Sequence, residues 1–271
     1  MNMSHFNGKV IWITGGSSGI GEGLVRVLAG SGARLILSAR RVAELERVRD
    51  TWPEADRQHI RILPFDLTDS ARLESVTQEA IAAFGHIDIQ ILNGGIAQRS
   101  LAMYTTLAVD RELMEVDYFS CVALSKYLLP HFQERGSGRF VVVSSVMGLI
   151  GTPFRSGYAA AKHALHGYFE SLRAEMWKKY RGVKVTIICP GWVKTNITMN
   201  AVAGDGSRLN SMDRATAHGM DPEVFARKML RAVARDKFQA MIGGPKETFA
   251  AWTMRHFPDL YARMIPHFNT R

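Results

Sequence analysis

The strongest constraint on the fold is a regular alternation of short apolar runs with segments of helical periodicity. Residues 10–13, 35–37 and 62–65 are apolar runs, and a helix-like segment separates each run from the next. Short strands that are apolar throughout and are separated by helices are typical of a parallel sheet covered on both faces. The first part of the chain is therefore predicted to form an α/β sheet.

The same alternation continues to residue 189. The further predicted strands are residues 87–92, 140–143 and 183–189, and the predicted helices include residues 70–84, 110–131 and 157–180. Six strands with five intervening helices form the order of a Rossmann-like doubly wound parallel sheet, whose ligand crevice lies at the carboxyl ends of the strands. Residues 1–271 are predicted to form a single domain of this α/β class.

Two segments after Pro190 depart from this alternation. Residues 191–220 are polar and irregular, which favours a substrate lid over a linker. Residues 245–271 form an aromatic and basic C-terminal extension that could close the substrate pocket, pack on a partner subunit or lie in a membrane interface. Packing within the protein or on a subunit is favoured, because the segment between Pro258 and Pro266 is barely two helical turns long.

The charge and the cysteine content argue against a nucleic-acid-binding protein and against a metal site. The 34 Lys and Arg residues outnumber the 25 Asp and Glu residues, but they are spread along the chain. This distribution favours a solvated surface over a nucleic-acid partner, although an excess of positive charge also suits a cofactor with several phosphates.

Cys121 and Cys189 are isolated and are interpreted as buried thiols with no metal. No run approaches the roughly 18 apolar residues of a transmembrane segment, so a cytoplasmic protein is predicted.

A glycine-rich segment follows the first predicted strand directly and precedes the first helix. Glycines allow the backbone to turn tightly and to approach a pyrophosphate, and the free amide groups at a helix start favour negative charge. Because a strand and a helix flank the segment, a dinucleotide site is favoured over a purely structural loop. The residues assigned to this site are Thr14, Gly15, Ser17, Ser18, Gly19, Ile20 and Gly21.

Arg40 and Arg41 follow the second predicted strand, where NAD-preferring sites place an acidic residue. Arginine forks match phosphate geometry, so binding of a 2′-phosphate is favoured over the alternative that both residues cap a solvated helix. The two arginines predict NADP(H) as the cofactor.

Three side chains suggest the chemistry. Tyr158 and Lys162 are four residues apart, so a helix places them one turn from each other on one face, and Ser145 ends the fifth predicted strand. A free tyrosine side chain exchanges protons poorly at neutral pH. A neighbouring ammonium and a positive nicotinamide would stabilise the phenolate and make general acid/base catalysis feasible.

The TGxxxGxG loop, Ser145 and the YxxxK pair resemble the short-chain dehydrogenase/reductase family, over about residues 9–195 and in its hydroxysteroid-dehydrogenase-like branch. The resemblance implies that Ser145 hydrogen-bonds the substrate oxygen, that Tyr158 exchanges its proton, and that Lys162 assists Tyr158 and holds the nicotinamide ribose. Further implied cofactor contacts are Asp66, Leu67, Asn93, Gly94, Gly95, Pro190, Gly191, Val193 and Thr195. Family members pair through two long helices, which implies a homodimer or homotetramer.

One position departs from the family. Its fourth catalytic residue is an asparagine, and the matching position here is Asp117. An aspartate could still position the water that the asparagine is thought to hold. Its charge would compete with Tyr158 for the influence of Lys162, which puts the pH profile of the reaction in question.

The sequence therefore predicts hydride transfer between NADP(H) and the carbonyl or alcohol group of a small, mainly apolar substrate. The candidate pocket residues are Met147, Phe154, Trp192 and Met199. An alternative is an NADP(H)-binding sensor or scaffold without turnover, in which Asp117 marks a decayed site. A lyase or epimerase is a further alternative, but the carbohydrate-binding tail usual in such relatives is missing.

Overall fold

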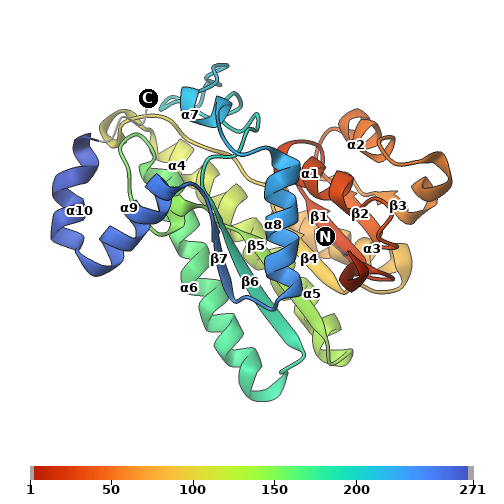
Figure 1. Ribbon diagram of the computed structural model, residues 1–271. Coiled ribbons are helices and arrows are strands. Elements are labelled where there is room, and N and C mark those ends of the chain that lie inside the picture. The colour runs from red at the N-terminus through yellow and green to blue at the C-terminus, as the bar shows by residue number, and fades with distance from the viewer. Residues whose placement is uncertain (1–2, 268–271) are drawn as a thin grey trace.

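The computed structural model describes residues 3–267 and places a parallel sheet between two layers of helices (Figure 1). The strands are β1 (Val10–Thr14), β2 (Arg34–Ser38), β3 (Ile60–Ile62), β4 (Ile89–Leu92), β5 (Gly138–Val143), β6 (Val183–Pro190) and β7 (Gln239–Ile242). Their order across the sheet is β3-β2-β1-β4-β5-β6-β7, and every neighbouring pair is parallel. The predicted Rossmann-like doubly wound α/β fold is confirmed.

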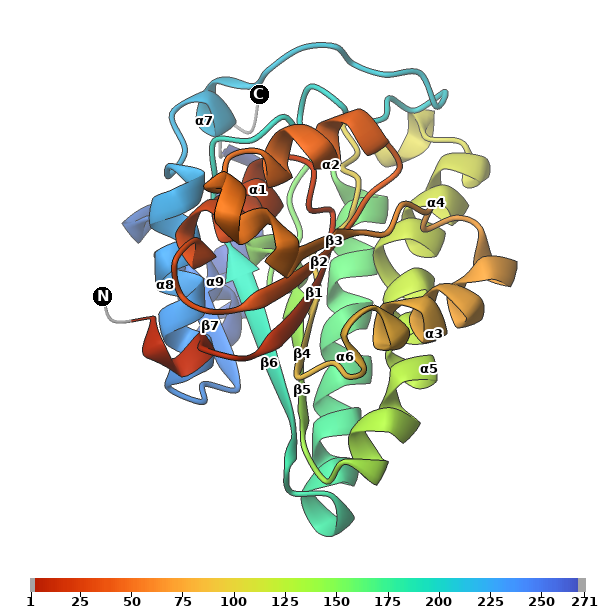
Figure 2. The same cartoon turned by 90° about the vertical axis from the view of Figure 1, so that its right-hand side faces the viewer.

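The helices cover both faces of the sheet (Figure 2). They are α1 (Gly19–Leu28), α2 (Val42–Arg49), α3 (Leu73–Phe84), α4 (Leu107–Met114), α5 (Ser120–Glu134), α6 (Ser156–Lys179), α7 (Arg214–Ala217), α8 (Pro222–Ala234), α9 (Pro245–His256) and α10 (Pro258–Met264). Ile11 and Ile13 pack with α1 and α8 on one face, whereas Val10 and Trp12 pack with α3, α5 and α6 on the other. Because alternate side chains point to opposite faces and both faces are covered, the strands are mainly apolar.

The order of the strands reverses between β1 and β4. The chain builds the sheet from β1 to β3 at one edge and then returns to place β4 on the other side of β1. The connections after these two neighbouring strands leave in different directions, which opens a crevice at their carboxyl ends. The segments that begin at Gly15 and Asn93 lie in contact with each other at this crevice.

The structure corrects three predicted elements. The prediction of six strands is wrong because β7 is a seventh strand, whose four residues are mostly half-buried and so lack a continuous buried pattern. The third strand is Ile60–Ile62 rather than residues 62–65, since Pro64 has no amide for a strand ladder. The single helix predicted at residues 110–131 is instead α4, a π-helical turn at Glu115–Phe119, and α5.

The two irregular segments contain short elements. Residues 191–220 include α7, and isolated bridges join Val193 to Met220 and Val202 to Gln98. The C-terminal extension forms α9, α10 and a 3₁₀ turn at Ile265–His267, and its last four residues lie outside the described range. Within residues 3–267, no helix combines the length and apolar character needed to cross a bilayer.

Candidate active site

The glycine-rich loop connects β1 to α1 and is held against the segment after β4. The Oγ1 atom of Thr14 accepts hydrogen bonds from the amides of Asn93 and Gly94, at 3.0 and 3.1 Å. The side-chain amide of Asn93 donates in return to the carbonyls of Thr14 and Gly15, at 3.1 and 3.2 Å. These four hydrogen bonds fix the two loops that flank the crevice.

Glycine is required in this loop for two physical reasons. Gly15 and Gly19 have φ values of +67° and +56°, in the left-handed region that favours glycine. A Cβ atom on Gly15 would also lie 2.8 Å from the Cα atom of Gly94, and one on Gly21 would collide with the Gly15 carbonyl. The side chain of Ser18, the residue before α1, accepts no hydrogen bond from the first turn of that helix. The amide groups of the first turn of α1 are thus not capped by Ser18, and glycines keep the loop beside them free of side chains.

A cavity of about 440 Å³ begins at this loop and runs along the carboxyl ends of the strands. Every residue that the sequence assigned to the cofactor lies on its wall except Gly21, whose role in the structure is the close contact with Gly15. Arg40 and Arg41 lie at one end with Asp66, and the Nη1 atom of Arg40 is 3.7 Å from an Asp66 oxygen. The structure therefore brings together residues from five separate strand ends.

Ser145, Tyr158 and Lys162 line the same cavity and are each at most 8% exposed. Ser145 follows β5, and its Oγ atom accepts a hydrogen bond from the Met147 amide at 3.1 Å. Tyr158 and Lys162 lie one turn apart on α6, with the Lys162 Nζ atom 5.6 Å from the centre of the Tyr158 ring. The three side chains predicted from spacing thus converge on one place.

Gln98 holds the start of α6 and was not identified from the sequence. Its Oε1 atom accepts hydrogen bonds from the amides of Gly157 and Tyr158, at 2.9 and 3.3 Å, and the side chain is 1% exposed. Helix starts leave amide groups without partners, so a buried acceptor at this position fixes the orientation of the helix that carries Tyr158. Gln98 comes from a loop far away in the sequence, and no local pattern indicates this contact.

Asp117 lies in the π-helical turn and is fully buried beside Lys162. Its Oδ1 atom accepts a hydrogen bond from the Ile96 amide at 2.8 Å. Its Oδ2 atom is 3.5 Å from the Lys162 Nζ atom and has no hydrogen-bond partner among the described residues. Burial raises the pKa of Asp117, and the Lys162 ammonium opposes this shift.

The contact with Asp117 also changes the pKa of Lys162. Burial alone would lower the pKa of Lys162, but the Asp117 carboxylate and, to a smaller extent, Tyr158 raise it above its usual value. Lys162 also donates a long hydrogen bond of 3.4 Å to the Val143 carbonyl. An ionised Asp117 at this distance would cancel part of the positive field of Lys162 before it reaches Tyr158.

Behind this pair, His166 ties α6 to the sheet. Its Nε2 atom lies 3.1 Å from the Ser144 hydroxyl and 3.7 Å from the Cys189 sulfur, and the residue is 9% exposed. The Ser144 hydroxyl donates to the Lys162 carbonyl at 3.1 Å. His166 therefore packs against the sheet, behind the face of α6 that carries Tyr158 and Lys162.

One end of the cavity, the candidate substrate pocket, differs from the sequence prediction. Met147 and Trp192 lie on its wall, but the structure does not place Phe154 or Met199 there. Polar residues missed by the sequence reasoning also line it, namely Glu112, Arg155, Thr198, Asn200, Arg208 and Thr216. The Arg155 guanidinium lies 5.0 Å from the centre of the Trp192 ring and 3.6 Å from an Asp213 oxygen. This end of the cavity is thus less uniformly apolar than predicted.

Comparisons with known proteins agree with this geometry. The family model described as short chain dehydrogenase matches residues 9–206. The chain is 42% identical to "Dehydrogenase/reductase SDR family protein 7-like" of Anopheles gambiae over 265 residues, which cover 96% of this chain and 83% of that protein. It is 41% identical to "Dehydrogenase/reductase SDR family member 7" of Homo sapiens over 252 residues, which cover 92% and 74% of the two chains.

Solved structures show the same fold. A short-chain dehydrogenase from Streptomyces avermitilis superposes with a TM-score of 0.76 at 26% identity, covering 94% of this chain and 95% of that one. A short-chain dehydrogenase/reductase from Burkholderia phymatum, in complex with NAD, gives a TM-score of 0.83 at 21% identity, covering 94% and 96%. The resemblance inferred from the motifs is confirmed, and the chain belongs to the short-chain dehydrogenase/reductase family of oxidoreductases.

Proposed function

We propose that this oxidoreductase transfers a hydride between NADP(H) and the carbonyl or alcohol carbon of a small, mainly apolar substrate. The observation that carries the proposal is the convergence of Ser145, Tyr158 and Lys162 on the cavity that begins at the glycine-rich loop. A dinucleotide that extends from this loop would bring its reactive end to these three side chains.

The residues around the cavity fit a nicotinamide dinucleotide. The loop has no room for a Cβ atom at Gly15, and it lines the cavity at the start of α1, where amide groups favour a pyrophosphate. The Burkholderia phymatum structure contains NAD, and a Thermococcus sibiricus alcohol dehydrogenase at 22% identity and a TM-score of 0.70 contains 5-hydroxy-NADP. Arg40 and Arg41 support the phosphorylated form for this chain, since both line the cavity after β2.

The chain's own residues handle the substrate oxygen and its proton. When bound, the cofactor supplies or accepts the hydride. The Ser145 hydroxyl donates a hydrogen bond to the substrate oxygen. The Tyr158 hydroxyl gives its proton to that oxygen in reduction, and the Tyr158 phenolate takes the proton of the alcohol in oxidation. The buried Lys162 ammonium stabilises the phenolate that remains, and Asp117 sets the strength of this effect through its 3.5 Å contact.

The alternative, a sensor or scaffold that binds NADP(H) without turnover, is less favoured. A site that only binds the cofactor does not require a serine and a tyrosine that line the same cavity. Asp117 is the feature that favours a decayed site. However, Asp117 pairs with Lys162, and Lys162 still lines the cavity beside Tyr158.

Spectroscopy separates the two functions. The absorbance of NADPH is followed during incubation with a panel of ketones and aldehydes, and we expect turnover of at least one apolar member. Tyr158→Phe should abolish this turnover and leave NADPH affinity within a few-fold, since only the hydroxyl is removed. Binding without turnover across the panel would favour the sensor, and retained turnover in Tyr158→Phe would identify another acid.

A further inference from the structure

The C-terminal helices α9 and α10 form a hairpin at the edge of the molecule, on the side away from β2 and α2 (Figure 1). One side of the hairpin is packed: Ala250, Thr253 and Tyr261 are buried, and the Tyr261 hydroxyl donates to the Gly151 carbonyl at 2.6 Å. Five other large apolar side chains of the hairpin are 37–51% exposed. We call these residues the hairpin surface, which consists of Phe249, Trp252, Met254, Phe257 and Leu260.

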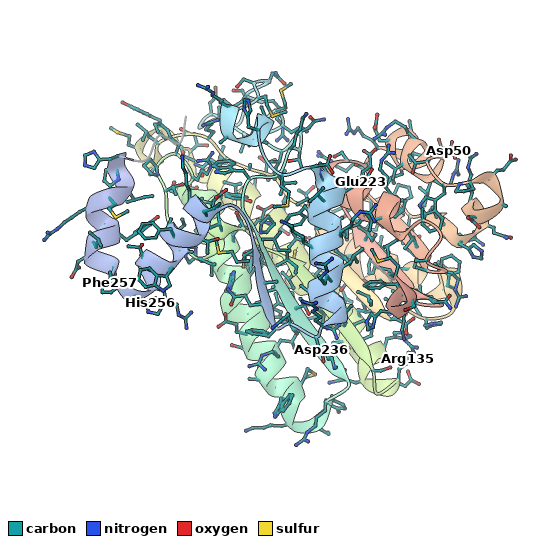
Figure 3. The ribbon with its side chains drawn as sticks, viewed as in Figure 1. Asp50, Arg135, Glu223, Asp236, His256 and Phe257 are labelled. Carbon is teal, nitrogen blue, oxygen red and sulfur yellow. The ribbon has the colours of Figure 1, made fainter. Side chains whose placement is uncertain are left out.

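The aromatic side chains of the hairpin surface form a cluster around Trp252. The Trp252 ring lies 6.3 Å from Phe249, 5.5 Å from Phe257 and 5.2 Å from His256, measured between ring centres. Figure 3 shows His256 and Phe257 at the turn between the two helices, on the outside of the molecule. Single exposed apolar residues are ordinary, but a preassembled group of this size marks a surface that meets a partner.

The charges of the hairpin identify the kind of partner. Lys246, Arg255 and Arg263 are exposed on the two helices. Asp259 is also exposed, whereas Glu247 is half-buried and accepts a hydrogen bond from the Trp192 amide at 3.4 Å. The hairpin therefore combines an apolar face with an excess of positive charge, as is typical of segments that lie in the interface of an anionic membrane.

We propose that the hairpin surface docks the protein on an anionic lipid bilayer, with the aromatic rings at the headgroup level. Tryptophan favours this position because its ring is apolar and its indole nitrogen is a hydrogen-bond donor. The apolar cluster and the basic side chains provide the two signals that stable peripheral binding requires. The helices lie on the membrane and do not span it, since α9 has 12 residues and α10 has seven.

A second copy of this chain fits the surface less well. A twofold contact places the same patch of both subunits face to face, so the excess positive charge of one hairpin would meet that of the other. Like charges across an interface disfavour association, whereas anionic lipid headgroups attract this positive charge.

Vesicle flotation tests the proposal on the full chain. The probes are phosphatidylcholine vesicles with and without phosphatidylglycerol, and we expect binding to the anionic vesicles that weakens with salt. Trp252→Ser and Phe257→Ser should each weaken this binding about tenfold, since each removes a large apolar side chain. Arg255→Glu and Arg263→Glu should each weaken it at least about fivefold. The matched controls are Tyr104→Ser and Lys228→Glu, which change an exposed aromatic and an exposed cation on other segments.

Two further measurements make the test decisive. Lipids with brominated chains should quench the fluorescence of the wild-type protein, and Trp252→Phe should remove most of this quenching whatever its effect on affinity. Failure of the wild type to float with anionic vesicles, or equal binding by the hairpin variants and the controls, overturns the proposal. It is also overturned if light scattering shows that Trp252→Ser dissociates a larger particle, because a second copy then covers the surface.

Discussion

The Asp117 carboxylate lies 3.5 Å from the Lys162 ammonium, and both side chains are buried behind Tyr158. A Cβ atom on Gly95 would lie 2.8 Å from the Asp117 Oδ1 atom and 3.3 Å from the Lys162 Nζ atom, so a glycine is needed beside this pair. The ion pair is the main departure of this site from its family, in which an asparagine occupies the position of Asp117. Its charge should control how strongly Lys162 acts on Tyr158.

Asp117→Asn should move the pH dependence of alcohol oxidation toward lower pH, by about one unit. Removing the carboxylate leaves more of the positive field of Lys162 to stabilise the phenolate of Tyr158, so this form is reached at lower pH. The measurement is kcat/KM as a function of pH for both proteins. A shift toward higher pH would mean that Lys162 loses its own charge without Asp117, since burial lowers the pKa of Lys162.

Arg40 and Arg41 should make NADPH bind at least about tenfold more tightly than NADH, a difference of about 1.4 kcal/mol. The double variant Arg40→Ala, Arg41→Ala should remove this preference with little change in NADH affinity, because only the 2′-phosphate loses its partners. Tryptophan fluorescence titrations measure both affinities, with Arg49→Ala as a control outside the cavity wall. Equal affinities of the wild type for the two cofactors would refute the assignment.

Gly15→Ala should abolish cofactor binding and destabilise the protein more than Gly30→Ala. Both glycines have a positive φ, +67° and +69°, so each substitution carries a strain of roughly 1–2 kcal/mol. Only at Gly15 does the added Cβ atom also meet backbone, because Gly30 has no neighbour within 4 Å among the described residues. Thermal melts and NADPH titrations of the two variants separate the effect of the close contact at Gly15 from the effect of the positive φ, which both variants share. Similar losses in both would show that close approach of the two loops is unimportant.

Asp88 should support stability at neutral pH and lose this effect in acid. Burial alone would raise its pKa, but the Val10 amide at 2.9 Å, with Lys9 and Arg135, holds the pKa of Asp88 below its usual value. A carboxyl whose folded pKa is depressed stabilises the fold above its unfolded pKa, about 3.9, and this contribution disappears as the pH falls through the folded pKa.

Asp88→Asn should therefore lower the free energy of unfolding at pH 7 and flatten its decline below about pH 4. Urea unfolding at a series of pH values measures both effects. Asp50→Asn is the control, since the pKa of Asp50 is also lowered but its contacts are fully exposed and screened by solvent. An unchanged acid slope in Asp88→Asn would show that other carboxyls cause the acid sensitivity.

Light scattering at micromolar concentration should give a homodimer or homotetramer. The expected contact is the outer side of α6 and of the π-helical turn before α5, where Trp177 and Phe119 are 61% and 50% exposed. Burial of these two side chains between subunits would stabilise the assembly. Trp177→Glu should weaken it, whereas Trp252→Glu on the hairpin should not. A wild-type particle with the mass of a single chain would contradict the expectation.

The sequence by itself determined the parts of the protein that depend on local pattern. Continuous apolar runs predicted the buried parallel strands, because both faces of each strand are covered. The glycine loop and the four-residue spacing of Tyr158 and Lys162 also follow from local geometry, since tight turns and helical periodicity are properties of neighbouring residues. These features located the crevice and the three side chains on its wall.

Only the tertiary structure decided what depends on contacts between distant segments. Gln98 binds the start of α6, Arg155 lines the cavity and Phe154 does not, and the short edge strand β7 pairs with β6. The tertiary structure also buried Tyr261 of the C-terminal extension and left Trp252 and Phe257 about half exposed in the single chain. Each of these outcomes depends on which surfaces meet once the sheet has formed, and a pattern of neighbouring residues carries no information on that.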